Sequence, residues 1–167
     1  MVNSFEEWIG KLTEAGLLCG DYVDKVDNAM SNKQIVDIGM DANGISYLPE
    51  MSSKGMPLPY DIITSRFSKF INGRYVCHTK SRNGNEYTSA LYCKYAGDID
   101  DADTTLLTLL GCSCTVNIAE NAFVRIYVDS NSAVKVNCPE SAAAIIEYWG
   151  DAEVSASGKV KKIKHGR

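Results

Sequence analysis

The hydrophobic period of the chain changes near Gly73, and this change constrains the fold more than any other feature. Before Gly73, apolar residues recur every three or four positions, as in amphipathic helices. After Gly73, short runs alternate apolar and polar residues, which indicates strands. We therefore predict an α+β fold, with a helical region at 1–72 and a β-rich region at 73–167. The two regions could also form one compact unit.

The helical region contains clear start and stop signals. Ser4 precedes Glu6 and Glu7 at the head of an apolar-periodic run, and Gly16 follows that run, so we predict a capped helix there. Further helices are predicted over 22–30, 32–40 and 61–71. Prolines and glycines are frequent between them, at 41–60, and we expect them to prevent a long regular element. The prediction for this segment is an ordered connector.

The β-rich region opens with a hairpin signal. Asn83-Gly84 lies between two β-prone runs, 74–79 and 87–95, and this dipeptide favours a tight hairpin turn. An acidic loop is predicted at 98–103. Seven short strands are predicted after it, at 106–110, 114–118, 123–128, 133–137, 144–149, 153–157 and 159–163.

The predicted strands begin roughly every 10 residues, a spacing that fits a sandwich, a jelly roll or a short β-solenoid. We find no strict repeat motif in the sequence. The strands are short and are joined by small-residue turns, and this favours the solenoid.

Charge and hydropathy narrow the classes of partner. The formal net charge is -4, so no overall positive field attracts nucleic acid or an anionic membrane. No apolar run approaches the roughly 20 residues of a membrane helix. The N-terminus carries acids where a secretory signal carries bases, so we expect a cytoplasmic protein. The basic tail 159–167 is interpreted as a solubilising end of the last strand.

The six cysteines are predicted to be free thiols that fill the core, since most lie in apolar runs of a chain without an export signal. Cys112 and Cys114 would share one strand face, whereas zinc ligands are usually spaced more widely, so we predict no metal site. Cys77 and His78 are adjacent in a predicted strand and would point to opposite faces. No cofactor is expected, because the usual nucleotide-binding motifs are absent.

No catalytic residue is predicted, because no common hydrolytic motif occurs in the sequence. An enzyme remains the alternative, with a site in the crevice between the helical and β regions. The residues named for that alternative are Asp41, Asn43, Tyr60, Arg74 and His78.

Aromatic residues are concentrated in or beside the predicted strands. Outward-facing aromatics on strands could form a surface that binds a protein or a glycan, although core packing would also explain them. The candidate binding residues are Tyr87, Tyr92, Tyr95, Tyr127, Tyr148 and Trp149.

Several segments resemble a known group of sequences. The run Asp41-Ala-Asn-Gly-Ile-Ser-Tyr-Leu-Pro-Glu-Met51, with 58–60, 71–75 and 87–92, is similar to uncharacterised proteins predicted in gut bacteria and their prophages or phages. That group has no established activity. The resemblance implies a protein of a mobile element, located in the cytoplasm or the virion, that serves in assembly or attachment.

Together these features favour a non-enzymatic structural or interaction module. We expect it to bind a protein partner or to form a homo-oligomer. Nucleic acid and membranes are not expected as partners.

Overall fold

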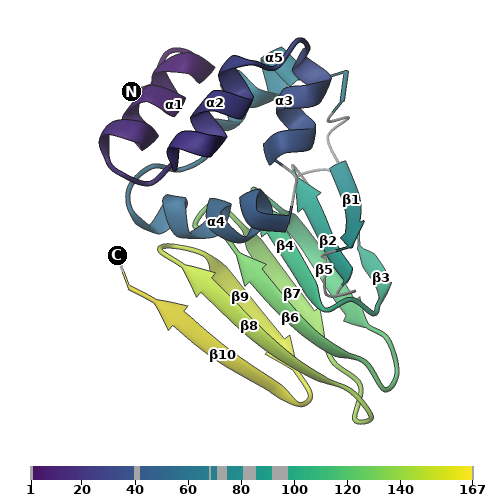
Figure 1. The fold of residues 1–167 in the computed structure, drawn as a ribbon. Helices are drawn as coiled ribbons and strands as arrows, with labels where there is room; N and C mark the ends of the chain where they lie inside the picture. Colours follow the sequence, from purple (N-terminus) through teal and green to yellow (C-terminus); the bar gives the residue numbers. More distant parts are fainter. Residues whose placement is uncertain are drawn as a thin grey trace.

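The computed structural model describes residues 2–39, 42–67, 69–70, 75–80, 86–91 and 98–166. In these residues, helices precede a β-solenoid, as Figure 1 shows. The helices are α1 Phe5–Glu14, α2 Gly20–Asp27, α3 Asn32–Gly39, α4 Ala42–Ser53 and α5 Tyr60–Phe67. The strands are β1 Tyr75–Lys80, β2 Glu86–Leu91, β3 Ile99–Ala102, β4 Leu106–Leu110, β5 Ser113–Ile118, β6 Phe123–Val128, β7 Ala133–Asn137, β8 Ala143–Trp149, β9 Glu153–Ser157 and β10 Val160–His165. The prediction of helices followed by a β-rich region is confirmed.

The first helix begins and ends where its sequence signals predict. The Ser4 hydroxyl accepts a hydrogen bond from the Glu7 backbone N–H at 3.1 Å, which caps the helix. Gly16 follows the helix with φ +66°, a conformation that glycine adopts without strain. Phe5, Trp8 and Leu12 are buried on one face of α1 and form the core of the helical layer with residues of the other helices.

Arg66 connects three of these helices. Its Nε donates a hydrogen bond to Asn32 Oδ1 at 3.2 Å, and its Nη1 donates to the Glu6 carboxylate. The guanidinium also lies 5.0 Å from the centre of the Phe5 ring, within range of a cation–π contact. The hydrogen bond from Arg66 lowers the pKa of Glu6 below its ordinary value.

Helix α4 is a correction to the predicted connector at 41–60. It spans 12 residues with Pro49 inside it, although proline removes one intrahelical hydrogen bond. Tertiary packing offsets that loss: Met51 is buried in the core of the helical layer, and Leu48 packs against the same core. The helix therefore continues past Pro49 and ends at Ser53, and a turn at Gly55 follows it.

The end of α4 is fixed to the solenoid. Ser52 is buried, and its hydroxyl bonds to the Ser130 hydroxyl and accepts from the Ser130 backbone N–H at 3.3 Å. Ser130 lies in the turn between β6 and β7. In Figure 1, α4 lies between the other helices and one end of the strands. The helical layer is therefore attached to the strand ends through this helix.

The β-rich region is a parallel solenoid built from two sheets. Sheet A has the strand order β1-β2-β4-β6-β8-β10, and sheet B has the order β3-β5-β7-β9. Successive strands from β3 to β10 alternate between the sheets, and all these neighbours pair in parallel. Phe123 pairs with Ala143 and Ala133 pairs with Glu153, in each case 20 residues further along the chain. One full coil therefore contains 20 residues, and the spacing of roughly 10 residues between strand starts corresponds to half a coil.

A ten-residue repeat, which the sequence analysis did not detect, defines each half-coil. A small residue follows each turn and is buried at the corner; these residues are Cys112, Ala122, Ser132, Ala142 and Ala152. In the turns before the last four of these corners, the corner N–H donates to the carbonyl three residues earlier, at 3.0–3.3 Å. Because side chains alternate along a strand, the residues two, four and six positions after a corner face inward. The core between the sheets consists largely of these positions.

The predicted acidic loop at 98–103 is in part strand β3, which is a second correction. Ile99 pairs with Val116 and Ala102 pairs with Ile118, and the register shifts between the two pairs. Asp101 has φ +52° within this bulge. The bulge adds a residue, so Ile99 and Ala102 both reach the core although they are three positions apart.

The predicted antiparallel pairing of the two hairpin strands is confirmed, whereas the predicted turn at Asn83-Gly84 lies outside the described residues. Strands β1 and β2 are antiparallel, with Lys80 opposite Glu86 and Tyr75 opposite Leu91. Strand β2 then pairs in parallel with β4, so the hairpin extends sheet A beyond the first coil.

A ladder of polar side chains runs along the outside of sheet B. The Asn117 side-chain amide donates to Asp100 Oδ1 and the Asn137 amide donates to Asn117 Oδ1, both at 2.8 Å. The Ser157 hydroxyl continues the ladder with a longer bond of 3.5 Å to Asn137 Oδ1. Each rung joins one coil to the next, so the ladder fixes the strand register.

Thr108 has a buried hydroxyl without a hydrogen-bond partner among the described residues. The residue is 0% exposed in β4, so the hydroxyl has lost its water contacts. We expect Thr108→Val to raise the free energy of unfolding by about 1 kcal/mol, because valine has nearly the same shape and no polar atom. Urea denaturation measures the change. The exposed Thr105→Val should be nearly neutral, and a destabilised Thr108→Val protein would show that the hydroxyl is satisfied.

Candidate functional site

The outer face of β6, β8 and β10 carries aromatic, ionisable and apolar side chains on neighbouring strands. Val124, Ile126 and Val128 of β6 point into the core, so the residues between them point away from it. The register of β8 and β10 extends that outer set across three strands. We call this surface the sheet A face; its residues are Phe123, Arg125, Tyr127, Ile145, Glu147, Trp149, Lys161, Ile163 and His165.

Trp149 lies at the centre of an aromatic group on the sheet A face. The His165 ring stacks on the indole with centroids 4.6 Å apart and planes at 14°. Tyr127 meets the same indole edge-on, at 5.3 Å and 78°. Trp149 is only 7% exposed, so it supports the two rings around it and offers little surface itself.

Glu147 connects the same three strands through a hydrogen bond to His165 and an ion pair with Arg125. Its carboxylate lies 2.8 Å from His165 Nε2 on β10 and 3.6 Å from Arg125 Nε on β6. The Glu147 side chain is 16% exposed, so water screens these contacts less than it would at an open surface. These polar and aromatic contacts hold the side chains of β6, β8 and β10 against one another on this face.

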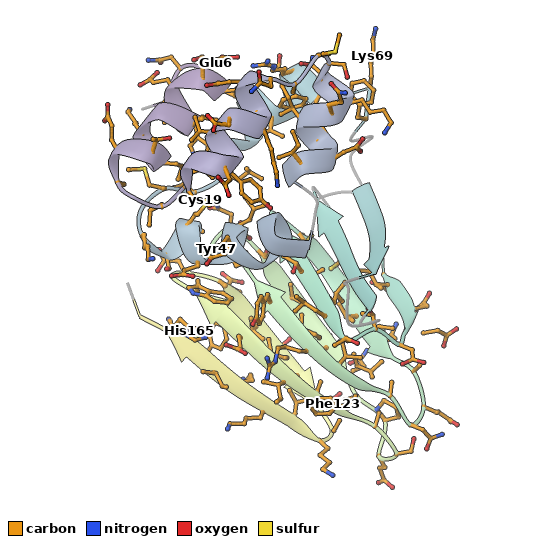
Figure 2. The ribbon with its side chains drawn as sticks, in the orientation of Figure 1. Glu6, Cys19, Tyr47, Lys69, Phe123 and His165 are labelled. Carbon is orange, nitrogen blue, oxygen red and sulfur yellow. The ribbon has the colours of Figure 1, made fainter. Side chains whose placement is uncertain are left out.

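Apolar side chains extend the face away from this cluster. Phe123 is 60% exposed, an unusual position for a phenylalanine ring. Ile145 and Ile163 are half-buried on the neighbouring strands. Figure 2 shows Phe123 near the end of the strands far from the helices, and His165 nearer to the helical layer. Aromatic and arginine side chains on a rigid surface are typical of protein-binding sites.

The edge strand β10 carries lysines on both sides. Lys162 and Lys164 pair in register with Ile146 and Tyr148, so they occupy the side of β10 that continues the core. The Lys162 ammonium reaches across to the Val154 carbonyl of β9, at 3.5 Å. Lysines at such positions protect an edge strand from unspecific strand pairing, because pairing would bury their charge.

The structure places three of the predicted binding aromatics. Tyr127 and Trp149 are in contact on the sheet A face. Tyr148 faces the other way and packs against the core between the sheets. Tyr87, Tyr92 and Tyr95 lie outside the described residues or have side chains outside them.

The residues of the alternative crevice site are not described in the structure. Asp41 and Arg74 lie outside the described residues, as do the side chains of Asn43, Tyr60 and His78. The prediction that cysteines fill the core is confirmed for Cys112, Cys114 and Cys138, whereas Cys19 is exposed. Within the described part of the chain, no group of three or more His, Cys, Asp or Glu residues is arranged to hold a metal ion.

Arg125, Glu147 and His165 were missed by the sequence analysis. The signal that could have found them is the coil repeat, which places Tyr127 opposite Glu147 and Trp149 opposite His165. No described helix is long and apolar enough to cross a membrane. Comparisons with family models, curated proteins and solved structures give no match.

Proposed function

We propose that this chain is a non-enzymatic assembly module that binds further copies of itself through the sheet A face. The observation that carries the proposal is the exposed Phe123 ring beside half-buried isoleucines, on a surface whose polar groups are already fixed by one another. An exposed apolar patch with aromatic and arginine side chains favours a protein partner over water.

Charge supports a second copy as that partner. Residues 1–30 contain six acidic and two basic side chains, whereas residues 159–167 contain five Lys or Arg and no acid. The helical layer is therefore acidic and the border of the sheet A face along β10 is basic. Opposite charges at the two ends of one chain favour a head-to-tail contact, in which α1 and α2 of one copy approach β10 of the next.

A repeated head-to-tail contact produces a ring or a filament. Either product suits particle assembly by a mobile element, the context that the resemblance in the sequence implies. For the enzyme alternative, the described residues provide no geometry that favours it.

Light scattering coupled to size-exclusion chromatography tests the proposal on the reduced protein. We expect an oligomer at low salt that dissociates as salt is added, because screening weakens the contact between acidic and basic surfaces. The variant Phe123→Ser should weaken assembly about tenfold or more, as is common for a central aromatic residue.

The matched control is Lys135→Ser in β7, which changes an exposed residue on the opposite sheet. It should leave assembly unchanged. A protein that stays monomeric at low salt and high concentration would overturn the proposal. So would an oligomer that Phe123→Ser leaves intact.

A further inference from the structure

We infer that an open hollow between α2 and α3 receives the Phe123 ring of another copy of the chain. The inference rests on the assembly proposed above and names the surface that the sheet A face contacts. The hollow has a volume of about 530 Å³. A cavity of about 150 Å³ holds benzene in another protein, so a phenyl ring fits here. We call it the α2–α3 hollow; its lining residues are Lys25, Asn28, Ala29, Gln34, Asp37 and Ile38.

The lining of the α2–α3 hollow suits an uncharged ring. Ala29 and Ile38 are half-buried and provide apolar surface. The two charged lining side chains have partners in their own chain. The Lys25 ammonium lies 5.0 Å from the centre of an aromatic ring of α2, and Lys33 Nζ lies 2.6 Å from the Asp37 carboxylate. A ring that covers the apolar surface therefore leaves neither charge without a partner.

Met30 adds apolar surface beside the hollow. Its side chain is 92% exposed, more than any other large apolar side chain that the structure describes. It follows Ala29 directly, in the turn between α2 and α3, and its backbone N–H donates to Gln34 Oε1 at 2.6 Å. Methionine side chains are flexible and make favourable contacts with aromatic rings. A ring from another copy would remove both Met30 and Phe123 from water, which favours the contact.

The acidic side chains of α2 are available to attract a basic surface. Asp21, Asp24 and Asp27 are exposed, and none of them forms an ion pair within the described part of the chain. Residues three positions apart are neighbours on a helix surface. By contrast, Glu6 and Glu7 of α1 each pair with a basic side chain of their own copy. Of the two acidic helices, α2 is therefore the better partner for a basic surface.

The matching cations lie beside Phe123 on the sheet A face. Arg125 is two residues from Phe123 on β6, and its side chain is 48% exposed. Ile145 pairs with Arg125 on one side and with the exposed Lys161 on the other, so both cations share this face. Docking α2 on the sheet A face therefore brings its aspartates toward these cations as the ring enters the hollow.

The ring must come from another copy. Figure 2 shows Phe123 near the end of the strands far from the helices, so a chain cannot fill its own hollow. Each copy carries the ring at one end and the hollow at the other. Such a contact is heterologous, and each copy can therefore join two neighbours.

A mixture of two blocked variants tests the inference, by light scattering coupled to size-exclusion chromatography at low salt. Ala29→Glu places a charge in the hollow, and Phe123→Ser removes the ring. Each variant alone should assemble about tenfold or more weakly than the unmodified chain. The Phe123→Ser copy retains the hollow and the Ala29→Glu copy retains the ring. An equimolar mixture should therefore form dimers of one copy each and nothing longer, whereas a mixture that stays monomeric would overturn the inference.

The matched control is Pro57→Glu. Pro57 is exposed beside a second hollow of the helical layer, so this variant adds the same charge to the same layer. It should assemble as the unmodified chain does, and a loss equal to that of Ala29→Glu would overturn the role of the α2–α3 hollow. Circular dichroism checks that every variant is folded. Asn28→Glu, at an exposed lining residue, replaces Ala29→Glu if that protein is unfolded.

The same experiment separates this inference from the proposed function. If Ala29→Glu assembles normally and Phe123→Ser does not, the sheet A face binds a different surface, and only the inference fails. If the unmodified chain is itself a monomer, the proposed assembly fails and the inference fails with it.

Discussion

Gly158→Ala is expected to lower the free energy of unfolding by about 3 kcal/mol, from strain and overpacking together. Gly158 forms the last turn, between β9 and β10, with φ +84°. A Cβ at this position would lie 1.9 Å from the Cys138 carbonyl oxygen, which belongs to the backbone of the coil below. Neither backbone can move away easily, because Cys138 N–H donates to the Ser157 carbonyl at 3.1 Å. Equilibrium urea denaturation measures the loss.

The control for this prediction is Gly55→Ala. Gly55 also has a positive φ, of +77°, but no atom lies within 4 Å of the position its Cβ would take. Its replacement should therefore cost about 1 kcal/mol, the effect of backbone conformation alone. Equal losses at the two positions would contradict the close approach of the last turn to Cys138.

Ile146→Ala is expected to cost about 2–5 kcal/mol, because it leaves a cavity between the two sheets. Ile146 is 0% exposed in β8 and is part of the core between the sheets, where Ile126 of β6 is its partner in register. The side chain is surrounded by fixed strands on both sides, so the site has little freedom to collapse. The measurement is again the midpoint and slope of urea denaturation.

The adjacent residue provides a matched control. Ile145 points to the outer face of the same strand and is only half-buried. Ile145→Ala removes the same atoms and should cost about 1 kcal/mol or less, since water remains nearby. If the two alanines were equally costly, the assignment of inner and outer faces in β8 would be wrong.

The local rules predicted the individual elements well. The Ser4 cap, the pairing of the two hairpin strands and the strand positions depend on neighbouring residues, and neighbours are visible in a sequence. Helix α4 was missed because Pro49 is unfavourable locally, and only the burial of Met51 and the attachment of Ser52 offset it. Strand β3 was missed because the bulge at Asp101 interrupts the alternation of apolar and polar residues that indicates a strand.

The candidate site was harder to predict than the fold. Aromatic content pointed to Tyr127 and Trp149, but strand alternation alone does not say which face of a sheet meets the core. Glu147 and His165 are 18 residues apart, and they come together only because parallel strands stack coil on coil. Recognising the ten-residue repeat from the buried small corners would have assigned both the faces and these neighbours.

The helical layer covers strand ends and is bonded through Ser52 to Ser130 in the turn between β6 and β7. The coil series itself has two other ends, which are the hairpin strand β1 and the lysine-protected strand β10 at the two edges of sheet A. The coils between these two ends share the same corners and the same inward positions. Duplicating one coil of 20 residues would add a strand to each sheet and lengthen the stack by about 4.8 Å, with both ends unchanged. Each tandem duplication would therefore increase the distance between the two end strands by the same step, because the added coil would repeat the inward-facing positions of the existing core.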